Sequence, residues 1–103
     1  MHMKVPLFRP QLGKEELKNL AEVFKTGWVG AGPLTQELEK QFAKSIGVNY
    51  AAGVTSCTAA LHIALQALGI KEGDEVIVPA ITVVSTPYAA LYNGAKPVFA
   101  DVE

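Results

Sequence analysis

Hydrophobic residues recur every three or four positions through the first half of the chain, which predicts two amphipathic helices. We expect the first helix from Lys14 to Thr26, stopping at Gly27, and the second from about Leu34 to Ile46, with Gly47 as its C-terminal cap. Each helix should pack by its apolar stripe, which consists of Leu17, Leu20, Ala21 and Phe24 in the first and of Leu38, Phe42 and Ile46 in the second.

After Gly47 the pattern changes to short apolar runs that alternate with helical segments. Strands are predicted at residues 50–54, 75–79 and 97–101, and helices at residues 58–68 and 85–92. This alternation is typical of a parallel sheet, so we expect an α/β fold in which N-terminal helices, in residues 4–47, precede a βαβαβ segment, residues 48–103. Residues 1–3, Met-His-Met, are interpreted as a tag remnant.

The composition narrows the classes of function. With 103 residues the chain is large enough for one domain, and we expect one. Half of the residues are hydrophobic, 18% are charged and the net charge is −1, which argues against a nucleic-acid-binding surface. No apolar stretch approaches the ~20 residues that a membrane span needs, and the single cysteine excludes an intrachain disulfide. We therefore expect a soluble, cytoplasmic protein.

The turn at residues 55–58 is the strongest candidate for a binding site. Thr55, Ser56 and Thr58 supply hydroxyls directly before an Ala- and Leu-rich helix, and no bulky side chain covers the backbone. The first N–H groups of a helix have no partner within it, and together with the helix dipole they favour an anion such as phosphate. The alternative is that Ser56 or Thr58 merely caps the helix, and this segment alone favours neither interpretation.

A second turn, residues 79–86, has similar chemistry. It follows the predicted strand 75–79, and ligands of open α/β sheets gather where the parallel strands end. Taken alone, this turn favours simple capping of the next helix by Ser85 or Thr86.

No catalytic residue is predicted. No partner for a reactive thiol at Cys57 is evident in the sequence, and a lone histidine within a helical run, such as His62, is usually structural. Dinucleotide-binding, P-loop and nucleophile-elbow motifs are absent, and so is the Cys and His spacing of a metal site. The residues by themselves indicate an α/β domain that can hold a phosphate.

Four stretches of the sequence resemble one family of enzymes. They are PLFRPQLGKEEL, GWVGAGPLTQELEKQFAKSIG, VTSCTAALHIALQALGIKEGDEVIVPAITVVST and NGAKPVFADVE, and they cover nearly the whole chain. In them the chain resembles the N-terminal part of the DegT/DnrJ/EryC1/StrS family, the pyridoxal-phosphate-dependent sugar aminotransferases. The resemblance implies the N-terminal portion of the large domain of a fold type I aminotransferase, with pyridoxal 5'-phosphate (PLP) as the cofactor of the full-length protein.

The resemblance also implies roles for individual residues. Cys57 and Thr58 match positions that hold the cofactor phosphate, although most relatives have Gly or Ala in place of Cys57. Val83 matches a position that usually stacks an aromatic side chain on the pyridine ring, and valine lacks that stacking, which is worth about 0.5–1.5 kcal/mol. Trp28 matches a position near the mouth of the active site and resembles a substrate or dimer contact. The alternative is that Trp28 anchors the first two helices.

The implied activity belongs to the complete protein. It is the transfer of an amino group from glutamate to a keto sugar attached to a nucleotide, by a homodimer that serves polysaccharide biosynthesis. The family's Schiff-base lysine is expected beyond residue 103, and no lysine of this chain matches it, so the chain alone should be inactive. In the family's sheet, later strands separate strand 50–54 from the next two. We therefore expect the fragment to rearrange its sheet, to self-associate or to belong to a longer polypeptide.

Three alternatives stay open. Some members of the same family have histidine in place of the Schiff-base lysine and dehydrate the sugar. The chain could instead be a non-catalytic module that binds phosphate or self-associates. A nucleotide-binding α/β domain of unrelated type is the third alternative, and it would bind a nucleotide more tightly than PLP.

Overall fold

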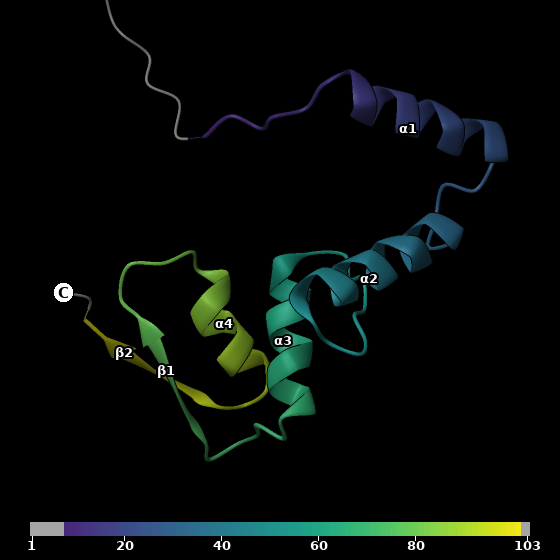
Figure 1. Ribbon diagram of the computed structural model, residues 1–103. Helices are drawn as coiled ribbons and strands as arrows, with labels where there is room; N and C mark the ends of the chain where they lie inside the picture. Colours follow the sequence, from purple (N-terminus) through teal and green to yellow (C-terminus); the bar gives the residue numbers. More distant parts are fainter. Residues whose placement is uncertain (1–7, 102–103) are drawn as a thin grey trace, which may run out of the picture. The chain divides into compact units, whose positions relative to one another are not determined.

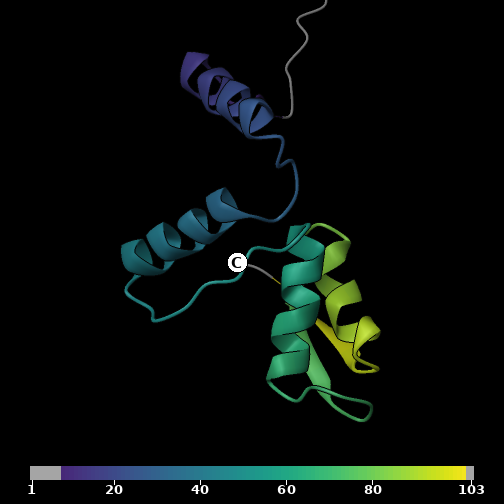
Figure 2. The same ribbon diagram turned by 90° about the vertical axis from the view of Figure 1, so that its right-hand side faces the viewer.

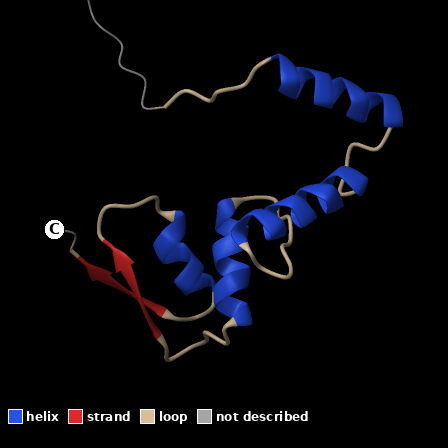
Figure 3. Ribbon diagram, in the orientation of Figure 1, coloured by secondary structure: helices blue, strands red, loops and turns tan. Residues whose placement is uncertain are grey.

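The computed structural model describes residues 8–101, in which helices precede and flank a small sheet (Figure 3). The chain divides into two compact units, Met1–Ala51 and Ala52–Glu103. This division lies close to residues 47–48, where the sequence predicts the change from helices to alternating strands and helices. The predicted tag remnant, residues 1–3, lies outside the described residues.

The first unit contains the two helices that the apolar periodicity predicts, α1 (Lys14–Thr26) and α2 (Pro33–Ile46). Each helix ends at a glycine in the left-handed conformation, with φ of 69° at Gly27 and 74° at Gly47, where a side chain would be strained. The start of α2 is one residue earlier than predicted, because Pro33 suits the first position of a helix.

The start of α1 is stabilised from inside the helix. The N-cap residue, Gly13, has no side chain, but its N–H donates to the Glu16 carboxylate at 2.6 Å. This hydrogen bond favours the ionised carboxylate, so it holds the pKa of Glu16 below the ordinary value of 4.5. The first turn of α1 is therefore sensitive to acid.

The apolar stripes of α1 and α2 are not buried, contrary to the expectation from the sequence. α1 does not pack on α2, and Ala43 is the only buried residue among the described residues of this unit. The large residues of the two stripes are 49–67% exposed, and they are Leu17, Leu20, Phe24, Leu38, Phe42 and Ile46. The described part of this unit contains no sheet against which an amphipathic helix could bury its stripe, which explains the difference.

The second unit is a helix followed by a βαβ unit (Figure 1). Its elements are α3 (Cys57–Ala67), β1 (Glu75–Pro79), α4 (Ser85–Tyr92) and β2 (Lys96–Ala100). The two strands pair in parallel with Glu75 opposite Lys96, and α4 connects them. α4 packs on both strands, and α3 packs on α4. The small core consists of Val78, Ala89, Ala90 and Ala95.

Most of the predicted elements of this unit are confirmed. Strand 75–79 and helix 85–92 have the predicted bounds, while α3 and β2 each begin one residue early. Pro87 lies in the first turn of α4, where a helix tolerates proline. Gly94 follows the helix with a φ of 75°, as expected for a residue that ends it.

The predicted strand at residues 50–54 does not form. These residues are irregular, and the described sheet contains only β1 and β2. A strand needs a hydrogen-bonding neighbour, and no described strand pairs with residues 50–54. The α/β class is confirmed, but the elements within residues 48–103 have the order αβαβ rather than βαβαβ.

Candidate phosphate site and tryptophan loop

Two helices begin at the edge of the sheet where both strands end. Because β1 and β2 are parallel, their carboxyl ends lie at the same edge. Figure 1 shows α3 and α4 starting at this edge, and Figure 2 shows their N-terminal ends side by side. The turns at residues 55–58 and 79–86 therefore share one edge of the second unit, which is the arrangement expected of a ligand site in an open α/β sheet.

Ser56 is the cap of α3. Its Oγ accepts a hydrogen bond from the N–H of Ala59 at 3.1 Å, and its carbonyl accepts one from the N–H of Ala60 at 3.0 Å. Of the two residues that the sequence allows as a cap, the structure therefore selects Ser56 over Thr58. The cap uses the third and fourth N–H groups of the helix, and the helix provides no partner for those of Cys57 and Thr58.

Capping and anion binding are consequently compatible at this turn, because they use different atoms. Cys57 is exposed and Thr58 is half-buried, so the first N–H groups and the Thr58 hydroxyl are within reach of a ligand. No acidic residue occurs from position 41 to position 71, which leaves the positive end of the helix dipole without a competing carboxylate in that part of the sequence. This donor set fits a phosphate group.

The turn at residues 79–86 lacks the predicted side-chain cap. The N-cap residue of α4 is Val84, and neither Ser85 nor Thr86 caps the helix. The turn instead closes through the N–H of Thr86, which donates to the Val83 carbonyl at 2.9 Å, and through contact of the Thr82 and Thr86 hydroxyls at 3.0 Å. Val84 has helical dihedral angles, so the chain already turns before α4 begins.

Val83 is placed on this turn with its side chain 70% exposed. An exposed valine at the carboxyl edge of the sheet offers an apolar surface to a planar ligand. Val83, Cys57 and Thr58 all belong to the second unit, whereas Trp28, the fourth residue singled out in the sequence, belongs to the first.

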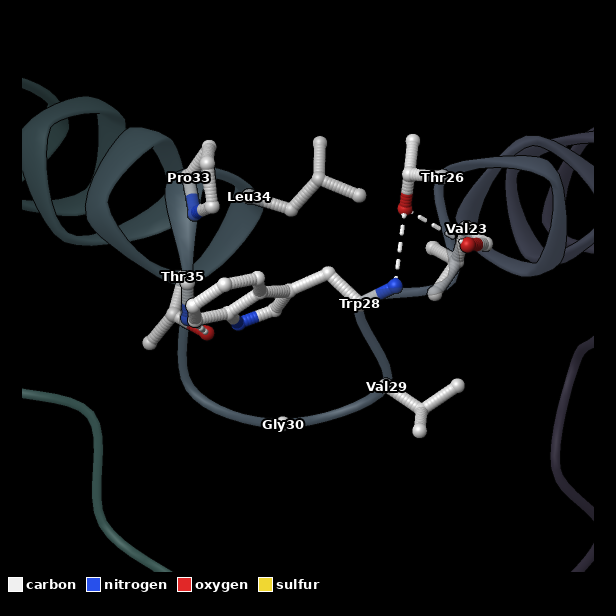
Figure 4. A pocket seen from close by; sticks show the side chains of 9 residues that line it. Val23, Thr26, Trp28, Val29, Gly30, Pro33, Leu34 and Thr35 are labelled. Carbon is white, nitrogen blue, oxygen red and sulfur yellow. Dashed lines mark hydrogen bonds between the residues drawn. The ribbon is translucent and has the colours of Figure 1, made fainter.

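Trp28 is held by its own loop rather than by a helix interface. Its indole Nε1–H donates to the Ala31 carbonyl at 2.9 Å, and its backbone N–H donates to the Thr26 hydroxyl at 3.2 Å. Figure 4 shows the indole lying along the loop toward Thr35, beside a hollow of about 420 Å³. The ring passes so close to Gly32 that a Cβ there would collide with it.

The lining of this hollow is mostly apolar. It is formed by Val23, Thr26, Trp28, Val29, Gly30, Gly32, Pro33, Leu34 and Thr35. The indole remains 59% exposed, so one face of the ring is available to a ligand or to a partner.

His62 and Asn93 join α3 to α4. The His62 ring is half-buried and lies 5.5 Å from the Tyr92 ring, which agrees with a structural role. The Asn93 side-chain amide donates to the His62 carbonyl at 3.2 Å and to the Ala89 carbonyl at 2.8 Å. No pattern in the sequence predicts this link, because asparagine before glycine is an ordinary way to end a helix.

The part of the chain that the structure describes contains no cluster of three metal-ligating side chains. None of the described helices is both long and apolar enough to cross a membrane.

Comparison with known proteins gives the site a family context. The sequence profile of the DegT/DnrJ/EryC1/StrS aminotransferase family matches residues 10–103. The spore coat polysaccharide biosynthesis protein SpsC of Bacillus subtilis strain 168 is 46% identical over 99 residues, which are 96% of this chain and 25% of SpsC.

Solved structures also match the chain over nearly its whole length. A sugar aminotransferase of Streptococcus pneumoniae in its PLP form matches with a TM-score of 0.87 and 32% identity, over 98% of this chain and 26% of that one. A GDP-4-keto-6-deoxymannose-3-dehydratase matches with a TM-score of 0.86 and 30% identity, over 97% of this chain and 28% of that one.

The chain thus spans about a quarter of the length of the relatives it matches. Within that quarter it has the fold of PLP-dependent aminotransferases, and the capped α3 turn is part of the shared segment. The match extends over nearly the whole chain in sequence and in structure, and the chain belongs to the DegT/DnrJ/EryC1/StrS aminotransferase family.

Proposed function

We propose that the complete protein, of which this chain is a part, is a PLP-dependent aminotransferase that acts on nucleotide-linked keto sugars with glutamate as the amino donor. The observation that carries the proposal is the start of α3, where the Ser56 cap leaves the first N–H groups to an anion. A relative matched over this segment is a sugar aminotransferase in its PLP form, and another is a polysaccharide biosynthesis protein.

The roles of the site residues follow from where they lie. The N–H groups of Cys57 and Thr58, with the Thr58 hydroxyl, would hold the cofactor phosphate at the positive end of α3. Val83 would lie against the pyridine ring, and Trp28 would border the substrate. PLP would supply the electron sink for the reaction, while these residues bind it and fix its orientation.

The chain alone is expected not to transaminate. Such a reaction needs a lysine held at the reacting carbon of the cofactor. None of the eight lysines lies in the turns at residues 55–58 and 79–86, so we expect the Schiff-base lysine to come from outside these 103 residues. The complete protein would act in the cytoplasm as a homodimer, in polysaccharide biosynthesis.

We call Cys57 and Thr58, with their N–H groups and the Thr58 hydroxyl, the phosphate seat. Its role can be tested by comparing the affinity of the protein for PLP with its affinity for pyridoxal, which lacks the phosphate. The difference in affinity isolates the contribution of the phosphate from reaction of the aldehyde with surface lysines. Thr58→Val removes one hydroxyl that would donate to a charged group, a bond worth about 1.5–3 kcal/mol. It should lower the preference for PLP roughly 10- to 100-fold.

Thr55→Val is the matched control, because it makes the same chemical change in the same turn at a hydroxyl to which the proposal gives no role. Its preference for PLP should equal that of the unchanged protein. An equal preference in Thr58→Val would refute the phosphate seat. Since Ser56 caps α3, loss of a helix cap would not account for a lower preference for PLP in Thr58→Val.

A second candidate function within the family is sugar dehydration. The structural match to the 3-dehydratase is nearly as good as the match to the aminotransferase, with TM-scores of 0.86 and 0.87. The two activities differ in the residue that takes the place of the Schiff-base lysine. Histidine at that position of the complete protein would favour the dehydratase, and lysine would favour the aminotransferase.

A further inference from the structure

The helix that carries the candidate phosphate seat is attached to the rest of its unit through a single neighbour. Among the described helices and strands, α3 packs only on α4, which in turn packs on β1 and β2. The position of Cys57 and Thr58 along the axis of α4, relative to the turn at residues 79–86, is therefore determined by the contact between α3 and α4.

Apolar packing determines this axial position of α3 only weakly. The buried residues of α4 are Ala89 and Ala90, 1% and 0% exposed, which have short side chains, and no residue of α3 is buried. A hydrogen bond is directional, so it distinguishes axial positions that a smooth apolar surface does not.

Asn93 supplies such a bond. At the end of α4 its backbone N–H donates to the Ala90 carbonyl at 3.0 Å, so the last turn is tightened and the Ala89 carbonyl is left to the Asn93 side chain. The same amide group also reaches the His62 carbonyl in the middle of α3 at 3.2 Å. This hydrogen bond links the C-cap of α4 to the middle of α3.

We propose that Asn93 is a positioning residue, which fixes the axial register of α3 on α4 and so places the seat at Cys57 and Thr58 beside Val83. The inference rests on the proposed function, because it is the phosphate seat that this register would serve. Cys57 lies five residues before His62, so the seat stands about 7.5 Å along the helix from the Asn93 contact. A slip by one helical turn would displace it by about 5.4 Å.

The test uses the single native cysteine as a reporter. A nitroxide spin label on Cys57 of the full 103-residue chain broadens the NMR signals of nearby amides, and the effect falls with the sixth power of distance. In the unchanged chain, the strongest broadening outside α3 and the turn before it should be in residues 82–86. Asn93→Leu, which removes both donated bonds, should weaken that broadening and spread it along α4.

Tyr92→Leu is the matched control, because it removes the ring contact with His62 at the same level of α4 but leaves the amide in place. Its broadening pattern should match that of the unchanged chain. An unchanged pattern in Asn93→Leu, or an equal change in Tyr92→Leu, overturns the proposal.

Asn93→Asp keeps the size of the side chain and removes its N–H donors, so it should reproduce the effect of Asn93→Leu. If both Asn93 variants unfold, the residue is needed for folding as such and the positioning role is refuted. No cofactor is present in this experiment, so its result does not depend on whether the chain binds PLP. Failure of the phosphate seat would appear separately, in the comparison of PLP with pyridoxal.

Discussion

Replacing Gly32 with alanine should release Trp28 from its loop. The backbone of Gly32 is extended, with φ of −163°, so alanine is compatible with the local conformation. The added Cβ would nevertheless collide with the indole at Nε1 and Cδ1. Since the backbone is held at the start of α2, the ring has to move, and its hydrogen bond to the Ala31 carbonyl is lost.

The size of the expected free-energy changes decides which measurement is informative. Loss of one neutral hydrogen bond costs about 1 kcal/mol, which is a roughly fivefold change in the ratio of docked to released indole. Alanine in place of glycine also restricts the unfolded chain and stabilises a protein by about 0.4–1 kcal/mol. The two effects nearly cancel in the free energy of unfolding, so stability is a poor readout and the position of the indole is a good one.

Fluorescence reports that position directly, because Trp28 is the only tryptophan in the chain. In Gly32→Ala we expect lower anisotropy and stronger quenching by acrylamide than in the unchanged protein. Gly30→Ala is the matched control in the same loop, since a Cβ at Gly30 would meet no atom within 4 Å. Its anisotropy and quenching should be those of the unchanged protein.

Two results would contradict this reasoning. If Gly32→Ala quenches and depolarises like Gly30→Ala, the indole does not lie against Gly32 in solution. If both variants release the indole, the loop responds to any added side chain, and the specific contact with Gly32 has no role.

Three further predictions concern helix ends. Ser56→Ala should destabilise the protein by about 1 kcal/mol in urea unfolding, whereas Ser56→Gly should cost only a few tenths. Because the pKa of Glu16 is lowered in the folded state, its carboxylate contributes stability that is complete above the ordinary pKa of 4.5 and is lost as the pH falls through the lowered pKa. The amide shift of Gly13, whose N–H donates to Glu16, should follow that titration and lose this response in Glu16→Gln. Gly94→Ala should destabilise more than Gly69→Ala in urea, since both residues have positive φ but only a Cβ at Gly94 would meet neighbouring backbone, at 3.3 Å.

The features that the sequence predicted correctly are local ones. The bounds of α1 follow from apolar spacing and a glycine stop, and those of β1 and α4 from alternation with turn residues. The edge shared by the two candidate turns follows from parallel pairing of the strands. All of these depend on residues close together in the sequence, which is the range over which patterns are informative.

The features that the sequence missed depend on distant partners or on exact atoms. An apolar run at residues 50–54 has the composition of a strand but no neighbour to pair with, so it stays irregular. Hydroxyl residues flank the start of α3 on both sides, and only coordinates show that Ser56 is the cap. The bond from Asn93 to His62 joins residues 31 positions apart, and no local pattern encodes it.

The Ser56 cap also has a consequence for the order in which this protein folds. Its hydrogen bonds join residues three and four positions apart, whereas pairing of β1 with β2 joins residues 21 positions apart. Helical turns form within about a microsecond, while translation adds only ~5–20 residues per second. The hydrogen bonds of the Ser56 cap can therefore form as soon as residues 56–60 are free to fold, before β1 and β2 have paired.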